Sequence, residues 1–368
     1  MKRLVLVGAG HAHGLVLNGW RQTLNPDIEL VLVAPVTQAP YSGMIPGWLA
    51  GQYQFEETVV DFVGLCQRAG ARLIRAELTK LDPDRNTIWL SDSQDLGYDW
   101  LSINVGSTLR PPAVDSSKVT MLAMRPLSTL KARYESLLAT WQATSSASPL
   151  RLTAVGGGAA GVESLLCVKH RLEQLRQDNP VHAQLITRGT SILPGFSQRA
   201  RHLALEALHQ ADVTVQIGTD WCATIAQSSD LIIWATGAQA HEWQTDPISR
   251  GNLQTDSAGF IAVDEHLRSV SHPNIFAVGD CAALPTPVPK AGVYAVRMGD
   301  TLRNNLNAVV SGQALSRFKR DGIALALLNT ANGTAIASWG RLGWQGKWVM
   351  RWKDRIDRGF IKQLICGV

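Results

Sequence analysis

The chain alternates short apolar runs with longer stretches of helical periodicity. Aliphatic side chains dominate Leu4 to Val7, Ile28 to Val33 and Asp230 to Ala235, whereas the residues after Gly161 change to a helical spacing. Short, nearly continuous apolar runs predict strands that are buried on both faces of a parallel sheet. Their alternation with helical stretches predicts an α/β fold.

The stretch from Arg151 to Glu163 carries the most regular motif. Its apolar run ends in Gly156-x-Gly158-x-x-Gly161 and continues as a helical pattern. Strand, tight turn and helix in this order are typical of a dinucleotide site, where backbone N–H groups at the helix start bind a pyrophosphate. The residues expected to contact the nucleotide are Gly156, Gly158, Ala159, Ala160 and Gly161.

A second Gly-rich turn, at Gly8 and Gly10, lies about one domain's length upstream, so two nucleotides are expected face to face. His13 occupies the place of the third glycine. His11 and His13 are expected to donate to phosphate or to line the cofactor, with a packed histidine as the alternative. No partner cluster supports a metal site, and no metal is predicted. The expected contacts are Gly8, Gly10, His11, Ala12 and His13.

Neither fold has the carboxylate that usually follows the second strand and binds a ribose hydroxyl. Ala34 and Pro35 stand there in the first fold, and Thr187 and Arg188 in the second. An arginine at this point can accept a 2′-phosphate, so NADPH stays open beside NADH. The alternative for Arg188 is a solvated loop charge.

The loop from Ala39 to Trp48 combines turn formers with Tyr41, Met44 and Trp48. A plain surface loop rarely exposes so much apolar surface, so we expect a wall over the cofactor, with simple packing as the alternative. Further expectations are a helix over 59–70, strands over 72–78 and 87–90, a strand over 99–105, a helix over 127–141 and a loop over 143–149.

Composition excludes several classes of protein. A chain of 368 residues with 45% hydrophobic content is long enough for two or three globular domains, and no run of 18 apolar residues predicts a spanning helix. The start is interpreted as a buried strand, not a signal peptide, because its apolar run stops at Gly8. Five widely spaced cysteines favour a reducing cytoplasm.

The positive charge is confined to the C-terminus. From Arg341 to Val368 there are seven Lys or Arg and two Asp or Glu, which accounts for the whole net charge of +5. Basic residues form no extended patch elsewhere, so nucleic acid is not an expected partner.

Three further motifs, in order, carry a family resemblance: Val105-Gly106-Ser107, Ala235-Thr236-Gly237 and Ile275 to Asp280. With the two Gly-rich turns, they resemble the two-dinucleotide-binding flavoproteins of the pyridine nucleotide-disulfide oxidoreductase superfamily. The resemblance implies that the first turn holds FAD, the second holds NAD(P)H, and Asp280 binds the FAD ribityl chain. It adds Tyr41, Leu78, Gly106, Gly237 and Gly279 to the expected cofactor contacts.

The implied fold is two Rossmann-like domains plus a C-terminal α/β segment. The FAD-binding domain is expected over 1–115 and 255–310, the inserted NAD(P)-binding domain over 116–254, and the C-terminal segment over 311–368. Without a Cys pair after the first helix, the chain looks closer to type II NADH:quinone dehydrogenases and sulfide:quinone oxidoreductases. It also resembles the flavoprotein domain fused to selenide, water dikinase in some bacteria, through the motifs 10–13, 41–44 and 352–357, which suggests kinship and not selenium chemistry.

Lys290 and Glu163 are the expected catalytic residues. The resemblance implies that the helix after Pro289-Lys290-Ala291 points its start at the flavin, where Lys290 and the helix dipole stabilise the reduced anion and Ala291 is a cofactor contact. Glu163 would face the nicotinamide. The alternative for Lys290 is an ordinary exposed lysine in a turn, and the alternative for Glu163 is a carboxylate at a helix start.

The C-terminus repeats large apolar residues every four positions: Trp344, Trp348, Trp352, Ile356, Phe360 and Leu364. Lys347, Arg351, Arg355, Arg358 and Lys362 flank them. We expect a basic amphipathic helix that lies on a membrane surface, with a dimer or domain-docking helix as the alternative.

The expected function is transfer of hydride from NAD(P)H to FAD and of electrons to a quinone-like acceptor, in the cytoplasm or on the inner face of the membrane. Two other hypotheses remain: sulfide or selenide oxidation at Cys167 or Cys281, and a non-enzymatic flavin-binding partner or sensor.

Overall fold

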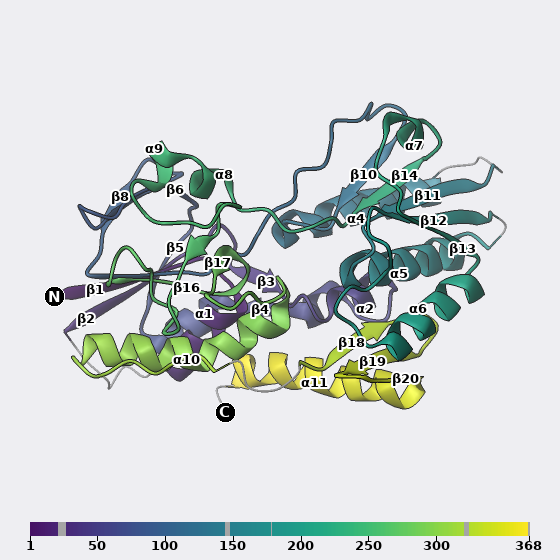
Figure 1. Ribbon diagram of the computed structural model, residues 1–368. Coiled ribbons are helices and arrows are strands. Elements are labelled where there is room, and N and C mark those ends of the chain that lie inside the picture. The colour runs from purple at the N-terminus through teal and green to yellow at the C-terminus, as the bar shows by residue number, and fades with distance from the viewer. Residues whose placement is uncertain (21–26, 144–147, 178, 320–323, 367–368) are drawn as a thin grey trace.

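The computed structural model describes residues 1–20, 27–143, 148–177, 179–319 and 324–366 (Figure 1). Part of the expected loop over 143–149, and the last two residues of the tail, lie outside this range. Two five-stranded sheets form the frame, and all their strand pairings are parallel. The expected α/β fold is confirmed.

The first sheet has the order β16-β9-β1-β2-β5. Its central strand β1 pairs with β2 from Lys2 opposite Ile28 to Val7 opposite Val33. Leu4, Val5 and Leu6 are fully buried, so the start of the chain is the buried strand that was expected. The strands are β1 (Lys2–Val7), β2 (Ile28–Val33), β5 (Arg72–Ile74), β9 (Trp100–Ile103) and β16 (Ile275–Ala277).

The second sheet has the order β10-β14-β11-β12-β13 and lies to the upper right in Figure 1. Its apolar strand β14 is buried throughout, as expected for an inner parallel strand. The strands are β10 (Thr120–Ala123), β11 (Leu150–Val155), β12 (Val181–Thr187), β13 (Val213–Ile217) and β14 (Leu231–Trp234).

Long helices cover both sheets. In the first domain α1 (His11–Gly19) packs between α10 (Gly292–Val310) and α3 (Phe62–Ala69). In the second, α5 (Ala159–Leu175) packs on β11 and β12, α6 (Gln198–Gln210) on β13, and α4 (Leu127–Ala143) on β10. Gly299 allows the close approach of α10 to α1, because a Cβ there would lie 2.5 Å from a Leu15 methyl carbon.

Smaller elements connect these layers, and two of them differ from expectation. The segment 59–70 begins as strand β4, which pairs with β3, and becomes helical only at Phe62; the segment 72–78 splits into β5 and the start of β6. The elements are β3 (Gln38–Pro40), α2 (Ile45–Leu49), the 3-10 helix η1 (Phe55–Thr58), β4 (Val59–Asp61), β6 (Leu78–Asp82), β7 (Thr87–Leu90), β8 (Asp95–Gly97), α7 (Ala223–Gln227), α8 (Glu242–Thr245), α9 (Pro247–Arg250), β15 (Ile261–Ala262), the 3-10 helix η2 (Gly279–Cys281) and β17 (Ala282–Ala283).

The return from the second sheet to the first occurs before α8. Trp243 and Leu253 are buried in the core cluster that contains Val5 and Val7 of β1. The segment 242–253 therefore packs with the first sheet, although the expected domain limit lies after it, at 254.

The C-terminal segment combines strands and a helix, as expected, but the helix begins later than the apolar series predicts. It forms an antiparallel sheet of β18 (Ala326–Asn329), β19 (Ala335–Trp339) and β20 (Leu342–Gly346), followed by α11 (Lys347–Cys366). Trp344 thus lies on a strand. In Figure 1 this segment, in yellow, runs along the lower edge of the molecule.

The apolar series on α11 also divides between two faces. Trp348, Trp352 and Ile356 are 53%, 36% and 41% exposed, whereas Phe360 and Leu364 are buried. The reason is geometric: residues four apart advance by about 40° around a helix, so the series winds by about 120° from Trp348 to Phe360. The face toward the core carries Val349, Lys353, Asp357, Phe360 and Leu364.

Candidate functional site

The Gly-rich turn of the second fold has the geometry of a phosphate cradle. Gly156 has φ of +122°, and a Cβ there would lie 2.3 Å from the Ala235 carbonyl oxygen; at Gly161 it would lie 1.8 Å from the carbonyl oxygen of Gly156. The first glycine thus makes the turn, and the third brings α5 onto the strand. A Cβ at Gly158, by contrast, would meet no atom of the described residues within 4 Å apart from its chain neighbours, which leaves room where a pyrophosphate would approach.

The turn of the first fold is built around Asn104, which follows β9. A Cβ at Gly8 or Gly10 would lie 2.4 or 2.0 Å from Asn104 oxygens. The Asn104 amide donates to Val278 O at 3.0 Å, which ties the turn to the end of β16. At Gly106, with φ of +73°, a Cβ would meet no atom of the described residues within 4 Å. These residues fit a dinucleotide at this edge of the sheet.

His13 takes the place of the third glycine by packing. It is fully buried; its Nδ1–H donates to Gly8 O at 2.7 Å, and its Nε2 accepts from Ser102 Oγ at 2.9 Å. Burial lowers its pKa to about 4, so the ring is neutral and this tautomer satisfies both nitrogens. The imidazole is therefore packed in the core, with both ring nitrogens hydrogen-bonded within the protein.

His11 begins α1 and lies in an aromatic group. Its ring centroid is 5.2 Å from that of Tyr41 and 5.9 Å from that of Phe360. Burial lowers the pKa of His11 to about 4, against an opposing effect of Asp280, and Ser42 N–H donates weakly to Nε2 at 3.4 Å. Among the described residues no cluster of three His, Cys, Asp or Glu could hold a metal.

The loop 39–48 contributes both packing and a link to the C-terminus. Met44 is fully buried, and Trp48 packs edge-on against Phe55 and Tyr134 at 5.1 and 5.0 Å. Tyr41 instead hydrogen-bonds to Asp357 of α11. Most of the apolar surface of this loop is therefore ordinary core.

The carboxyl edges of the two sheets meet at an ion pair. Arg125 follows β10 of the second sheet and Asp280 follows β16 of the first; Arg125 Nη1 lies 2.5 Å from Asp280 Oδ2. Beside this pair, Thr108 and Gln239 exchange two backbone hydrogen bonds of 2.9 and 3.0 Å. Ligands bound at the two edges would thus face each other.

Lys290 makes its own side-chain contacts with Ala282 and Phe260. Nζ donates to Ala282 O at 2.5 Å and lies 3.8 Å from the centroid of the Phe260 ring. Burial lowers the pKa of Lys290. Its carbonyl oxygen accepts from Arg125 Nη2 at 3.3 Å, so Arg125 is the cation in contact with Asp280.

Glu163 lies in a buried charged cluster and not at a solvated helix start. It is 9% exposed, and its Oε1 accepts the Asn329 N–H at 2.6 Å. Burial raises the pKa of Glu163 to about 7, against the effect of the Lys353 ammonium. Lys353 Nζ donates to Gly43 O at 2.6 Å and to Asp357 Oδ2 at 2.8 Å.

The two cysteines considered for sulfide chemistry are fully buried thiols. Burial raises the pKa of Cys281 to about 11 and that of Cys167 well above its usual range. Cys281 Sγ donates to Ile103 O and Val278 O. A protonated, inaccessible thiol is a poor nucleophile, so neither residue supports this hypothesis.

The remaining expected contacts lie at strand ends or in the core. Leu78 is buried in the core of the first sheet, Ala12 is buried in α1, and Pro35 and Arg188 are exposed after β2 and β12. Gly237 follows β14 with no atom of the described residues within 4 Å of a Cβ, Gly279 has φ of +71°, and Ala291 is the N-cap of α10. Ala159 and Ala160 begin α5.

Sequence reasoning assigned no role to Arg125, Asn104, Lys353 or Asp357. Asn104, directly before Val105-Gly106-Ser107, stands next to a motif that could have identified it, and Lys353 and Asp357 lie within the motif 352–357. Arg125 stands near none of the motifs.

Comparison with known proteins gives a family and a fold. The family model described as pyridine nucleotide-disulphide oxidoreductase matches residues 2–299. A type II NADH:quinone oxidoreductase of Haemophilus influenzae is 28% identical over 212 residues, which cover 51% of this chain but only 46% of that protein. One from Staphylococcus aureus is 21% identical over 355 residues, covering 86% of this chain and 85% of the relative.

Solved structures share the fold at low identity. The sulfide:quinone oxidoreductase of Aquifex aeolicus superposes with a TM-score of 0.81 at 16% identity, covering 100% of this chain and 92% of that one. NDH2 of Plasmodium falciparum in complex with NADH gives 0.76 at 16% identity, covering 100% and 99%.

Proposed function

Because the chain belongs to the pyridine nucleotide-disulphide oxidoreductase family, we propose that it is an FAD-dependent enzyme that oxidises NAD(P)H and reduces a quinone-like acceptor. The observation that carries the proposal is the meeting of two parallel-sheet carboxyl edges, each with a Gly-rich turn, at Arg125 and Asp280. The quinone-like acceptor is suggested by the names of the relatives from Haemophilus influenzae and Staphylococcus aureus.

The two folds divide the nucleotides between them. The turn at Gly8 and Gly10 would hold FAD, with Asp280 on its ribityl chain, and the turn at Gly156 and Gly158 would hold NAD(P)H. Bound flavin would supply hydride and electron transfer, and the protein's part is to hold the two rings together and keep water out. Exposed Arg188 leaves the choice between NADH and NADPH open to experiment.

Anaerobic titration of the purified flavoprotein tests this function. The flavin absorbance at about 450 nm should bleach on addition of NADH or NADPH and return when a soluble quinone is added. Absence of bleaching with both nucleotides would refute the nicotinamide half of the proposal. If ferricyanide reoxidises the bleached flavin but a quinone does not, the proposed quinone-like acceptor is refuted.

Glu163 is the proposed proton-holding group of the site. With a pKa of about 7 it can hold or release a proton at neutral pH, as reduction of a quinone-like acceptor requires. The neighbouring ammonium of Lys353 keeps the ionised form accessible in spite of burial. We therefore propose proton transfer, and not nicotinamide binding, as the catalytic role of Glu163.

The exposed face of α11 is the proposed membrane contact. Trp348 and Trp352 stack with centroids 6.3 Å apart, Ile356 continues the row, and the basic Arg351 and Arg355 lie exposed beside it. Tryptophans flanked by basic residues suit an anionic membrane interface. No helix among the described residues is long and apolar enough to cross a membrane.

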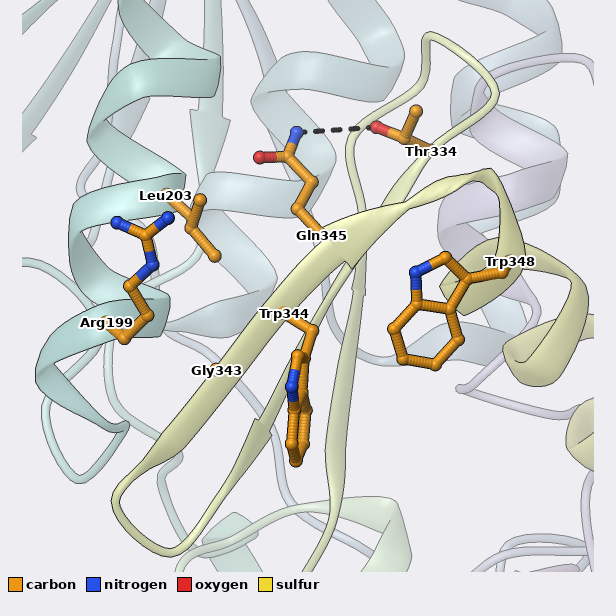
Figure 2. A pocket seen from close by; sticks show the side chains of 7 residues that line it. All are labelled: Arg199, Leu203, Thr334, Gly343, Trp344, Gln345 and Trp348. Carbon is orange, nitrogen blue, oxygen red and sulfur yellow. Dashed lines mark hydrogen bonds between the residues drawn. The ribbon is translucent and has the colours of Figure 1, made fainter.

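A cavity of about 510 Å³ beside this face extends the apolar surface. Figure 2 shows Trp344 and Trp348 on its wall, opposite Arg199 and Leu203 of α6. Although Trp344 lies on strand β20 and not on α11, it shares this cavity with the exposed Trp348.

Vesicle flotation with Trp348→Ala/Trp352→Ala tests the membrane contact. The parent should float with vesicles of phosphatidylcholine and phosphatidylglycerol, and the double variant should stay in solution; Ile248→Ala, which trims an exposed side chain on α9, is the matched control. If the double variant floats like the parent, this face is not the membrane contact. If it instead turns a dimer into a monomer, α11 is the homodimer interface that remains the alternative.

A further inference from the structure

Arg125 occupies a position that joins the two nucleotide folds. It lies in the segment between β10 and α4, in the second fold, and its side chain is 28% exposed. Its guanidinium donates to three groups of the first fold: Ser107 after β9, Asp280 after β16, and the carbonyl of Lys290 before α10. One guanidinium therefore contacts three separate segments of the first fold.

The contacts of Asp280 with Arg125 and Ser107 involve only one of its two carboxylate oxygens. Arg125 Nη1 and Ser107 Oγ both approach the same carboxylate oxygen, Oδ2, at 2.5 and 3.2 Å. Among the described residues no hydrogen bond reaches Oδ1. A carboxylate with one oxygen clamped and the other free has a fixed orientation, and it can still accept a hydroxyl donor.

We propose that Arg125 is a positioning residue for FAD, which fixes Asp280 so that Oδ1 accepts from the ribityl chain. This inference rests on the proposed FAD site. It gives the main cationic role at this junction to Arg125 in place of Lys290, whose ammonium is engaged by Ala282 O and the Phe260 ring. Because Arg125 belongs to the second fold, the affinity for FAD depends on the position of that fold against the first.

Geometry also predicts that lysine is a poor substitute. The guanidinium reaches Ser107 and Asp280 with Nη1 and the Lys290 carbonyl with Nη2, from one rigid plane. A single ammonium can keep the charge beside Asp280 but cannot reproduce this fork.

The test is FAD binding to the apoprotein, measured by flavin fluorescence without electron donor or acceptor. Arg125→Gln should raise the dissociation constant about tenfold or more, and Arg125→Lys by a smaller factor of about three. Arg151→Gln, which removes a comparable surface Arg–Asp pair with Asp230 on the second sheet, is the matched control and should bind FAD like the parent.

A double-mutant cycle separates positioning from general weakening. Since Arg125 acts through Asp280, Arg125→Gln/Asp280→Asn should bind FAD within about twofold of Asp280→Asn alone. Fully additive losses, or Arg125→Gln binding as tightly as the parent, would overturn the proposal. If Arg125→Gln does not fold, parental affinity in Arg125→Lys overturns it equally. A parent that binds no FAD refutes the proposed function instead.

Discussion

Glu163→Gln should change how the stability of the protein depends on pH. The Glu163 carboxyl is 9% exposed, and burial raises its pKa from an ordinary 4.5 to about 7. The glutamine side chain of the variant cannot ionise but keeps an oxygen that can accept the Asn329 N–H. The substitution therefore removes the titration with little change in shape.

The sign and size follow from proton linkage. Between about pH 4.5 and 7 the folded parent binds a proton that the unfolded chain has released, so its stability falls as pH rises through this window. At about 1.4 kcal/mol per pH unit, the loss approaches roughly 3 kcal/mol above about pH 7 and vanishes below about pH 4.5. The free energy of unfolding of the variant, relative to the parent, should rise by the same amount.

Urea unfolding of both proteins at about pH 4.5, 6 and 8 measures this difference. Glu135→Gln, which removes an exposed carboxylate of α4, is the matched control. A difference between variant and parent that stays constant over this pH range would refute the raised pKa, and with it the proton-holding role of Glu163.

Three further substitutions probe the frame of the site. Lys353→Met leaves the buried Asp357 carboxylate without its ammonium and should cost about 3–5 kcal/mol in urea unfolding at neutral pH; a cost below about 1 kcal/mol would contradict the buried pair. Gly156→Ala, at φ of +122° and 2.3 Å from a carbonyl, should lower the melting temperature far more than Gly237→Ala, where a Cβ meets no atom of the described residues; equal effects would contradict the cradle. His13→Ala removes two buried hydrogen bonds and much of a packed ring, which should cost about 2–4 kcal/mol by calorimetry; unchanged stability would argue for an exposed imidazole.

The frame could be predicted from sequence because its signals are local. Buried parallel strands appear as apolar runs, and a turn at positive φ next to another backbone needs glycine, as at Gly8 and Gly156. Each signal lies within a few residues, so one sequence is enough to place both folds.

The charged part of the site could not be predicted in this way. Arg125 and Asp280 are 155 positions apart and come from different sheets, and no local pattern links them. Lys353 likewise stands in a basic stretch whose exposed members look the same in sequence. Its burial depends on where α11 meets the loop at Gly43, which tertiary packing alone decides.

Helix α11 departs from the usual arrangement of an amphipathic helix at two places, and the proposed function gives both departures a reason. It buries the Lys353–Asp357 pair, at a desolvation cost that a salt bridge seldom recovers, while it exposes Trp348 and Trp352. The buried pair acts electrostatically on Glu163, and the exposed tryptophans form the proposed membrane contact. One helix thus carries both the proposed membrane contact and the charged pair that acts on the proposed proton-holding group.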